Sequence, residues 1–597
     1  MRWVIAASTS LALLQPAVTL AQIQADADSA AVHEILIADV MIPMRDGVRL
    51  NARMYRPLGA TSPGPAVFSL TPYTSDDAHQ RGRFFAQHGY VYLNVNTRGR
   101  GGSEGESWPL EQDGPDGYDI VEWIGQQPWC DGRVAMRGGS YRGMVQWQTL
   151  KEDPQVLATV VPTAAVHPGW DYPNPSGIFL SYAARWLAFV NGAASQSSLF
   201  GDDDYWQGKY LEKHREHRPF ADLDELTGLP PRVFQRWIEH PYYDRFWQDM
   251  NPGPEDYARL DLPVLTITGY FDGDQPGAMK YYSDHMLYGS ASGAAKHYLV
   301  LGPWSHAGTR NPAKELGGLT FGDNSVLDME QLHLDWFNWV FHAGEQPEIL
   351  RDRVAYYVME ANEWKYAPNV EAVATGTRTW YLTSRDGHAN DVFRSGGLSL
   401  EQPTVAGTDS YTYDPLVTIE AYSELAALNS GYIGAGAAFT PYPKLVYHSP
   451  PLEGDLEVSG YAKVAAYIEL NVPDTDMVAS LYEVRRDGST IYLGTSELRA
   501  RHREGVDRVV LAEPGEIELY TFDRFYWFSR RLLEGSRLRL VIMPLNTPDR
   551  DKNYNSGGDT IRETAADART AVVKLHHGPQ HPSAVLLPVS HSDGGRG

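Results

Sequence analysis

The stretch "MRGGSYRGMVQWQ", residues 136–148, decides the fold class of this chain. The apolar run "RVAMRGGS" that ends at Ser140 has the length of a buried strand, and the residues after it have helical composition. A serine at such a strand-to-helix turn is typical of the hydrolase pattern Gly-x-Ser-x-Gly. Gly138 fits this pattern, but Arg142 occupies the place of the second glycine and Gly143 follows one residue later. Taken alone, the stretch fits a glycine-rich turn as well as a nucleophile.

Strands and helices alternate around this stretch, from about Ile35 to Ala165. "DVMIPMRDGVRLNARMYRP" predicts a hairpin that turns at Asp46-Gly47, and "PAVFSL", "GYVYLNVN" and "ATVVPTAA" are short apolar runs of strand length. "DGYDIVEWIGQQ" has helical spacing, with Asp116 as a candidate N-terminal cap. Short buried strands separated by helices predict an α/β fold, with a mostly parallel sheet between two layers of helices.

The alternation breaks over residues 166–255, which are rich in Trp, Tyr and charge. Helical stretches such as "FLSYAARWLAFVNG" and "LPPRVFQRWIEH" predict a helical cap inserted into the α/β domain. The strand pattern returns at "LPVLTITGYFDG" and "KHYLVLGPWSHAG", and "DMEQLHLDWFNWVFH" predicts a closing helix. We therefore expect the α/β domain to comprise residues 33–165 and 256–345.

The remainder, residues 350–590, changes to period-two alternation. Apolar residues of one strand fall on a single face: Val464, Ala466, Ile468 and Leu470. Asp487-Gly488 is a hairpin signal. Many short strands with turn residues between them predict a C-terminal all-β domain, a sandwich of the jelly-roll type.

Composition limits the partners of the protein. The chain has 597 residues, which is too long for one core, and a formal net charge of −24, which argues against nucleic acid and anionic membrane surfaces as partners. The one cysteine, Cys130, excludes an intramolecular disulfide. The sequence has no His-Glu-x-x-His motif and no clustered Cys/His spacing, so we expect no metal and no other cofactor.

The N-terminus has the pattern of a secretory signal peptide. "MRWVIAASTSLALLQPAVTLAQ" carries one arginine, then an apolar stretch, then small residues near Ala21. We expect cleavage after residue 21 and an exported protein, periplasmic or secreted. Polar residues and Pro16 interrupt the stretch as a membrane span, and no later segment reaches 18 apolar residues, so stable membrane insertion is not expected.

Two later stretches supply the partners that a nucleophilic serine needs. "TITGYFDGDQPG" is a strand followed by an acidic turn with Asp272 and Asp274, and "YLVLGPWSHAG" is a strand followed by a loop with His306. The order Ser140, Asp272, His306 is that of an α/β-hydrolase triad. All three follow the carboxyl ends of predicted strands, where open α/β sheets place their sites. Asp274 is the competing choice for the acid.

The stretches "RDGVRL", "TPYTSDD", "NVNTRGRGGSEGE", "WCDGRVAMRGGSYRG", "TGYFDG" and "GPWSHAG" resemble the cocaine esterase / Xaa-Pro dipeptidyl peptidase family of serine hydrolases. The stretch "EHPYYDRFWQ" resembles the α-amino acid ester hydrolase branch of that family. Members of this family have Gly-x-Ser-Tyr-x-Gly, which Ser140-Tyr141-Arg142-Gly143 fits. The resemblance implies that Ser140 is the nucleophile, His306 the base and Asp272 its partner. It also implies that the phenol of Tyr73 and the backbone N–H of Tyr141 bind the oxyanion.

One position departs from that branch. α-Amino acid ester hydrolases have an acidic residue at the place of Arg142, as part of a carboxylate cluster that holds the substrate ammonium. A cation there repels an ammonium. Two roles for Arg142 stay open: it attracts a substrate carboxylate, or it pairs with an acid such as Asp274 or one of the cap.

We therefore expect a serine hydrolase that cleaves an ester or amide bond of a small substrate, and the sequence leaves a homo-oligomer open. Two alternatives remain. One is Xaa-Pro dipeptidyl peptidase activity within the same family. The other is a carbohydrate-binding or adhesion protein in which the triad is inactive.

Overall fold

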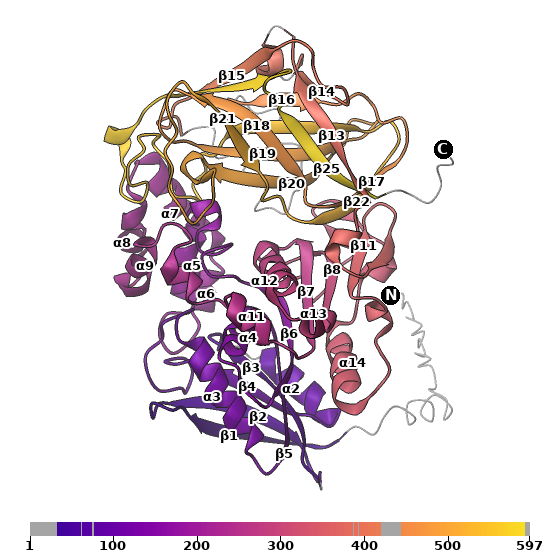
Figure 1. Cartoon of the computed structure of the whole chain (residues 1–597). Helices are drawn as coiled ribbons and strands as arrows, with labels where there is room; N and C mark the ends of the chain where they lie inside the picture. Colours follow the sequence, from indigo (N-terminus) through magenta and orange to yellow (C-terminus); the bar gives the residue numbers. More distant parts are fainter. Residues whose placement is uncertain are drawn as a thin grey trace, which may run out of the picture.

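A ten-stranded mixed sheet forms the first half of the protein (Figure 1). The computed structural model describes residues 33–60, 62–74, 77–385, 387–391, 393–418 and 443–590, so the expected signal peptide lies outside the described residues. The strand order is β1-β2-β4-β3-β5-β6-β7-β8-β11-β12. In chain order the strands are β1 (Ile35–Pro43), β2 (Arg49–Pro57), β3 (Gly64–Thr71), β4 (Val91–Asn96), β5 (Cys130–Ser140), β6 (Leu157–Ala165), β7 (Val264–Phe271), β8 (His297–Ser305), β11 (Val354–Val358) and β12 (Glu363–Ala367).

The centre of this sheet is parallel, as predicted. The pairs from β4–β3 to β8–β11 are all parallel, whereas β1–β2, β2–β4 and β11–β12 are antiparallel. The hairpin expected at Asp46-Gly47 is confirmed by the pairing of β1 with β2. The strands β11 and β12 lie after residue 350, where the alternation of the sequence changes, and yet they extend the first sheet.

Helices cover both faces of the sheet. Successive side chains of its central strands point to opposite faces, and both sets are apolar, so each face packs against a layer of helices. Phe68 and Met136 pack in one core with α3 (Asp113–Gly125) and α4 (Tyr141–Lys151). Val67 and Ala135, one residue earlier on the same strands, pack in the other core with α2 (Asp77–Gln87) and α14 (Met329–His342). All four strand residues are fully buried, which explains why these strands read as continuous apolar runs.

The expected helix cap at Asp116 is wrong. The N-terminal cap of α3 is Gln112, whose side chain makes no capping bond, and Asp116 lies inside the first turn. Its carboxylate instead accepts hydrogen bonds from Arg98 Nε at 2.7 Å and Nη2 at 2.6 Å. A bidentate pair with an arginine stabilises a carboxylate more than a neutral backbone N–H does, so a distant residue decides its orientation.

The chain between β6 and β7 forms the inserted helices, and α5, α7, α8 and α9 stand beside the all-β domain (Figure 1). The helices of the insertion are α5 (Tyr182–Phe189), α6 (Ser197–Phe200), α7 (Asp203–Arg215), α8 (Leu223–Thr227), α9 (Pro231–Ile238), α10 (Arg245–Gln248) and α11 (Pro254–Arg259). After β7 the chain continues into α12 (Gln275–Tyr288) and α13 (Ala291–Ala295). Hydrogen bonds tie the insertion to the C-terminal domain, including Ser181 N–H to Asp549 O at 2.8 Å and Arg499 Nη1 to Gly177 O at 2.9 Å.

The C-terminal domain is all-β, as predicted. Its thirteen strands belong to one hydrogen-bonded set: β13 (Gly376–Thr383), β14 (Gly396–Ser399), β15 (Gly407–Tyr413), β16 (Leu445–His448), β17 (Leu456–Gly460), β18 (Lys463–Leu470), β19 (Asp476–Val484), β20 (Thr490–Arg499), β21 (Ile517–Phe522), β22 (Phe528–Leu532), β23 (Arg537–Pro544), β24 (Ala571–His577) and β25 (Ala584–Ser590). The expected inward face of β18 is confirmed, because Val464, Ala466, Ile468 and Leu470 are buried.

Candidate active site

Ser140 occupies a strained turn at the end of β5 and the start of α4. Its backbone has φ 65° and ψ −127°, a conformation that costs a non-glycine residue of order 1–3 kcal/mol and is common at functional sites. The first N–H groups of α4 lack partners within the helix. The turn therefore presents the hydroxyl of Ser140 beside a set of backbone donors.

The two glycines near Ser140 allow close packing. A Cβ on Gly143 would lie 2.8 Å from the carbonyl oxygen of Thr163, on the neighbouring strand β6. Gly138 has φ 142°, and a Cβ there would meet the Cβ of Arg142 at 2.5 Å. The glycine at position 143, one residue later than in the common pattern, is thus the point where α4 approaches the sheet.

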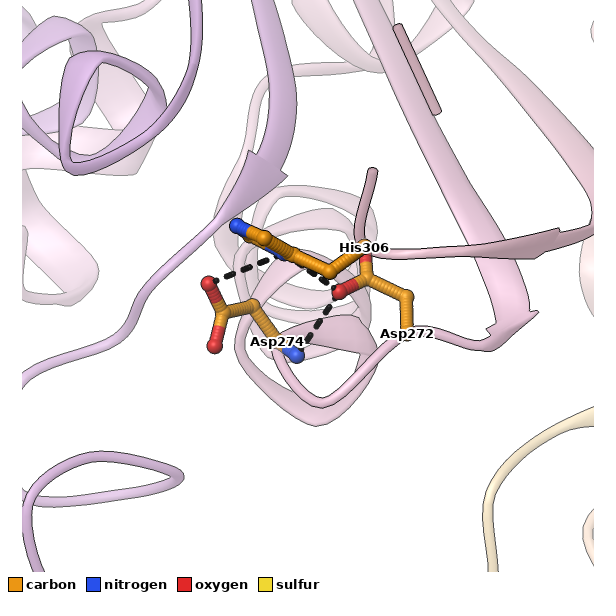
Figure 2. A group of neighbouring side chains, drawn as sticks. All are labelled: Asp272, Asp274 and His306. Carbon is orange, nitrogen blue, oxygen red and sulfur yellow. Dashed lines mark hydrogen bonds and ion pairs between the residues drawn. The ribbon is translucent and has the colours of Figure 1, made fainter. Parts of the chain in front are cut away.

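His306 and Asp272 follow the ends of two adjacent strands, β8 and β7. His306 Nδ1 lies 2.8 Å from Asp272 Oδ1, and the Asp272 side chain is fully buried (Figure 2). The backbone N–H of Asp274 donates to the same Asp272 oxygen at 3.0 Å, and Thr268 Oγ1 donates to Oδ2 at 3.2 Å. Both oxygens of Asp272 are therefore held, and its orientation toward the imidazole is fixed.

Asp274 approaches the same histidine from the other side. Its Oδ2 lies 3.5 Å from His306 Nδ1 and accepts a hydrogen bond from Ser140 Oγ, also at 3.5 Å (Figure 2). Its side chain is 20% exposed, so it is less enclosed than Asp272. The second ring nitrogen of His306 lies at the end of the ring far from Asp272 (Figure 2). The hydroxyl of Ser140 thus contacts Asp274 in this arrangement.

The charges of these groups shift one another's pKa values. Burial lowers the pKa of His306, but the carboxylates of Asp274 and Asp272 outweigh it and raise the pKa above its usual value. Burial raises the pKa of Asp274 to about 6, against the opposing attraction of His306 and Arg310. A protonated His306 is therefore stabilised by two acids, which is the electrostatic requirement of a base that must hold a proton during a reaction.

Tyr73 and Tyr141 lie next to the serine but make different contacts. The Tyr73 hydroxyl accepts a hydrogen bond from Trp186 Nε1 at 3.2 Å, which leaves its own proton to donate into the cavity. The Tyr141 hydroxyl donates to Asp113 Oδ2 at 2.6 Å, away from the cavity. What Tyr141 can offer to a substrate is its backbone N–H at the first position of α4.

Arg142 lies in the first turn of α4, only 8% exposed, and lines the cavity. Its guanidinium carbon is 5.9 Å from the centre of the Tyr73 ring. The positive charge lowers the pKa of the Tyr73 phenol, although burial outweighs it and raises that pKa overall. The guanidinium of Arg142 therefore lies next to Tyr73, the predicted oxyanion donor.

One cavity of about 1120 Å³ is bordered by the candidate site residues other than Asp272, namely Tyr73, Ser140, Tyr141, Arg142, Asp274 and His306. Its wall combines residues from the sheet edge, the inserted helices and the C-terminal domain. An aromatic part of the wall comes mainly from the insertion: Tyr172, Tyr182, Trp186, Phe189 and Phe200. A cavity at the upper end of small-ligand pockets, with one apolar side and a few convergent polar groups, is suited to a small organic substrate.

The charged part of the cavity wall is richer in bases than the rest of the chain. Six basic residues border it: Arg142, Lys280, Arg310, Lys463, Arg524 and Arg550. Five acidic residues border it: Asp171, Asp274, Glu497, Asp523 and Asp549. Sequence reasoning identified two of these eleven, Arg142 and Asp274. Arg310 follows His306 by four residues, and that proximity was the one available signal for it.

A buried glutamine connects the acidic turn to the C-terminal domain. Gln275, fully buried at the start of α12, donates from Nε2 to Trp527 O at 2.8 Å and to Gly269 O at 3.0 Å. Its Oε1 accepts from the Trp527 N–H at 2.7 Å. The backbone N–H of Gln275 donates to Asp272 O at 3.0 Å. The turn that carries Asp272 is therefore fixed to residues more than 250 positions later.

The ligand atoms of Asp272, Asp274 and His306 all lie within 4.8 Å of one another, a spacing that could also surround a metal ion. The hydrogen bond between His306 Nδ1 and Asp272 already accounts for the grouping. We therefore interpret these three side chains as a carboxylate–histidine system and assign no metal to them.

Comparisons with known proteins agree with this geometry. Residues 46–308 match the model of the X-Pro dipeptidyl-peptidase (S15) family, and residues 350–586 match its C-terminal non-catalytic domain. The cocaine esterase of Rhodococcus sp. (strain MB1 Bresler) is 29% identical over 577 residues, which cover 92% of this chain and 98% of the esterase. Among the described residues, none of the helices has the length and apolar character that a membrane crossing requires.

Two solved structures share the fold over nearly the whole chain. An aminopeptidase from the marine sediment archaeon Thaumarchaeota archaeon superposes with a TM-score of 0.78 at 21% identity, covering 93% of this chain and 97% of its own. An α-amino acid ester hydrolase gives a TM-score of 0.77 at 22% identity, covering 94% and 98%. At these identities the likeness establishes the fold alone. Together with the matching family models, the findings establish that the chain belongs to the serine hydrolases of the X-Pro dipeptidyl-peptidase (S15) and cocaine esterase type.

Proposed function

We propose that the protein is an exported serine hydrolase that cleaves an ester or amide bond of a small substrate through an acyl-enzyme. Ser140 is the nucleophile, His306 the general base and Asp272 the acid that orients it. The observation that carries the proposal is the 2.8 Å contact of His306 Nδ1 with the buried Asp272, on the same cavity edge as the strained Ser140. Nucleophile, base and orienting acid are the three parts that covalent acyl transfer requires.

The reaction follows from these positions. Ser140 Oγ rotates from Asp274 toward His306, because geometry in a free site often tightens only when substrate binds. Its oxygen forms a bond to the substrate carbonyl carbon while His306 Nε2 takes the hydroxyl proton. The carbonyl oxygen becomes an oxyanion that accepts from the Tyr73 hydroxyl and the Tyr141 N–H. The bond from that carbon to the leaving oxygen or nitrogen then breaks as His306 gives it the proton, which leaves an acyl group on Ser140. Water, deprotonated by His306, attacks the acyl carbon, and the bond to Ser140 Oγ breaks to release the acid and restore the hydroxyl.

Covalent labelling tests this proposal. A fluorophosphonate should add one label per chain, on the peptide that contains Ser140. The same experiment separates an enzyme from a binding protein with an inactive triad, because the latter would stay unlabelled while folded. Labelling at another serine would contradict the assignment of Ser140.

A second candidate is Xaa-Pro dipeptidyl peptidase activity. It requires an acidic group near the nucleophile to hold a peptide N-terminus, and the carboxylate of Asp274, 3.5 Å from Ser140 Oγ, favours it. Comparing Ala-Pro-p-nitroanilide with simple p-nitrophenyl esters distinguishes the two activities. Hydrolysis of the anilide with kcat/KM above that of the esters would favour the peptidase.

Export is part of the proposal and rests on the composition of residues 1–21. The mature N-terminus of the expressed protein tests it. A chain that begins at residue 22 and is recovered outside the cytoplasm supports export, whereas an intact Met1 in the cytoplasmic fraction contradicts it.

A further inference from the structure

Arg524 borders the cavity from the loop between β21 and β22 of the C-terminal domain. Its guanidinium carbon lies 4.1 Å from the centre of the Trp170 ring. Its backbone N–H donates to Ser496 Oγ at 3.1 Å. An arginine stacked on an aromatic face keeps the N–H groups at its edge available for a planar ligand.

The guanidinium of Arg524 has no hydrogen-bonded or ion-paired partner among the described residues. Two acids, Asp523 and Asp171, attract its charge. Asp523 is exposed. The carboxylate of Asp171 is already engaged, since Oδ1 accepts from the His167 N–H at 2.8 Å and Oδ2 from the Gly277 N–H at 2.7 Å. Burial lowers the pKa of Arg524 to about 10, so neither acid compensates for its loss of solvent.

The surroundings of Arg524 are unusual for so acidic a protein. The whole chain has a formal net charge of −24, but the cavity wall has one more basic than acidic side chain. Lys280 also approaches the Trp170 ring, with Nζ 5.0 Å from its centre, but it is paired with Asp284 at 2.5 Å. Two of the acids in the wall, Asp549 and Glu497, are paired with Arg550 at 2.6 and 2.9 Å. Burial and the nearby carboxylate of Asp274 hold the pKa of Asp171 well above its usual range. Arg524 itself has no such pair among the described residues, so its guanidinium is available to bind an anion.

We propose that Arg524 binds a carboxylate of the substrate, so that the preferred substrates are esters or amides that carry a free carboxylate. This inference rests on the proposed function and specifies its substrate class. Arg524 is a binding residue remote from the bond that breaks, and its guanidinium can donate two parallel hydrogen bonds to a carboxylate. A bound carboxylate would replace the solvent that the arginine has lost, which a neutral substrate cannot do.

Matched ester pairs test the proposal. Each pair consists of the p-nitrophenyl monoester of a dicarboxylic acid and the p-nitrophenyl ester of the monocarboxylic acid of equal length, over a series of chain lengths. We expect the wild type to favour the carboxylate member at one or more lengths. Arg524→Met should lower this preference about 10- to 100-fold, the range expected for a hydrogen-bonded charge, with little change for the neutral esters.

Two further variants distinguish a direct contact of Arg524 with the carboxylate from an effect of the protein's overall charge. Arg524→Lys keeps the charge but loses the planar fork, so it should retain part of the preference. Arg486→Met removes a positive charge from an exposed arginine of the same domain, which pairs with Glu534, and should leave the preference unchanged. If Arg486→Met lowered the preference as much as Arg524→Met, the effect would be one of net charge and the proposal would be overturned.

The outcome on the wild type alone is also decisive. Equal kcat/KM for both members of every pair would overturn the carboxylate site, and so would a preference that survives in Arg524→Met. If Arg524→Met does not fold, inhibition of the wild type by alkanoates and by the matching alcohols replaces it. Stronger inhibition by the alkanoate is expected, and equal inhibition overturns the proposal. Failure of neutral esters to react, or of Ser140 to label, counts instead against the serine hydrolase function.

Discussion

Two carboxylates face the same nitrogen of His306, and replacing each by asparagine identifies the one that orients the base. Asp272 lies 2.8 Å from Nδ1 and is fully buried, whereas Asp274 lies 3.5 Å away and is partly exposed. A distance of 2.8 Å is that of a charge-assisted hydrogen bond, and 3.5 Å is outside that range. We therefore expect Asp272→Asn to disable the base and Asp274→Asn to perturb it.

The two losses should differ greatly in size. An amide at position 272 can still sit in the same place, but it can donate to Nδ1 and so stabilise the wrong tautomer. This change costs about 10⁴-fold in kcat in the well-studied triad, equivalent to about 5.5 kcal/mol of transition-state stabilisation. Asp274→Asn removes a longer and less enclosed contact. The carboxylate of Asp274 also has a pKa raised to about 6, so it loses its charge at a higher pH than an ordinary aspartate does. A loss of about tenfold or less in kcat is expected.

The pH dependence of kcat/KM gives an independent test. His306 acts as a base only when neutral, so activity falls as the pH drops through its pKa, which the two acids raise above the usual value. Removing the charge of Asp274 lowers that pKa, and the acid limb should move to lower pH in Asp274→Asn. The assay is hydrolysis of a neutral p-nitrophenyl ester from pH 4.5 to 9, with circular dichroism as the control for folding. Equal losses in the two variants, or an acid limb that moves upward, would refute the assignment of Asp272.

Three further outcomes are expected. Tyr73→Phe should lower kcat by about 10²–10³ with little change in KM, because the proton of the phenol is donated to the oxyanion and not to the bound substrate; nearly full kcat would mean that the ring only packs. Ser140→Ala and His306→Ala should each lose roughly 10³-fold or more, and the double variant little more, since they act as a unit; additive losses would contradict this. Gln275→Leu removes three side-chain hydrogen bonds that hold the acidic turn, and it should lower kcat about tenfold at unchanged KM. Gln275→Glu should restore only the bond from the Trp527 N–H. A wild-type kcat and pH profile in Gln275→Leu would show that the turn keeps its conformation without these bonds.

The sequence predicted the turn at Ser140 and the strand end before His306, because both depend on residues close together in the chain. The elbow at Ser140 follows from an apolar strand, two glycines and a helix in sequence, and His306 follows from a strand end. These positions are recognisable because parallel strands bring their carboxyl ends to one edge. The sequence also indicates a place for Asp274 beside His306, as the competing acid, but it does not predict the contact of Asp274 with Ser140, because that contact depends on how the turn after β7 folds back on itself.

Long-range contacts explain the features that the sequence could not predict. Asp116 has the composition of a helix cap, but Arg98 binds its carboxylate. The strands β11 and β12 lie in the stretch where period-two alternation begins, and yet they pair with β8 of the first sheet. Arg524 is one arginine among many until the insertion brings Trp170 against it. In each case the decisive partner is far along the chain, and no spacing rule connects the two.

The C-terminal domain contributes residues to the wall of the candidate active site. Its Trp527 shares a buried core with Tyr270 of β7 and Tyr356 of β11, so the two domains have apolar residues in common. The backbone of the same Trp527 holds Gln275 next to the acidic turn, and three residues earlier Arg524 faces the cavity. The loop between β21 and β22 therefore holds the turn that carries Asp272, the proposed partner of His306. The same loop presents Arg524, whose charge we infer selects the substrate. Because this loop lies outside the sheet that carries Ser140, its cavity-facing side chains can change substrate preference while the three proposed catalytic groups stay in place.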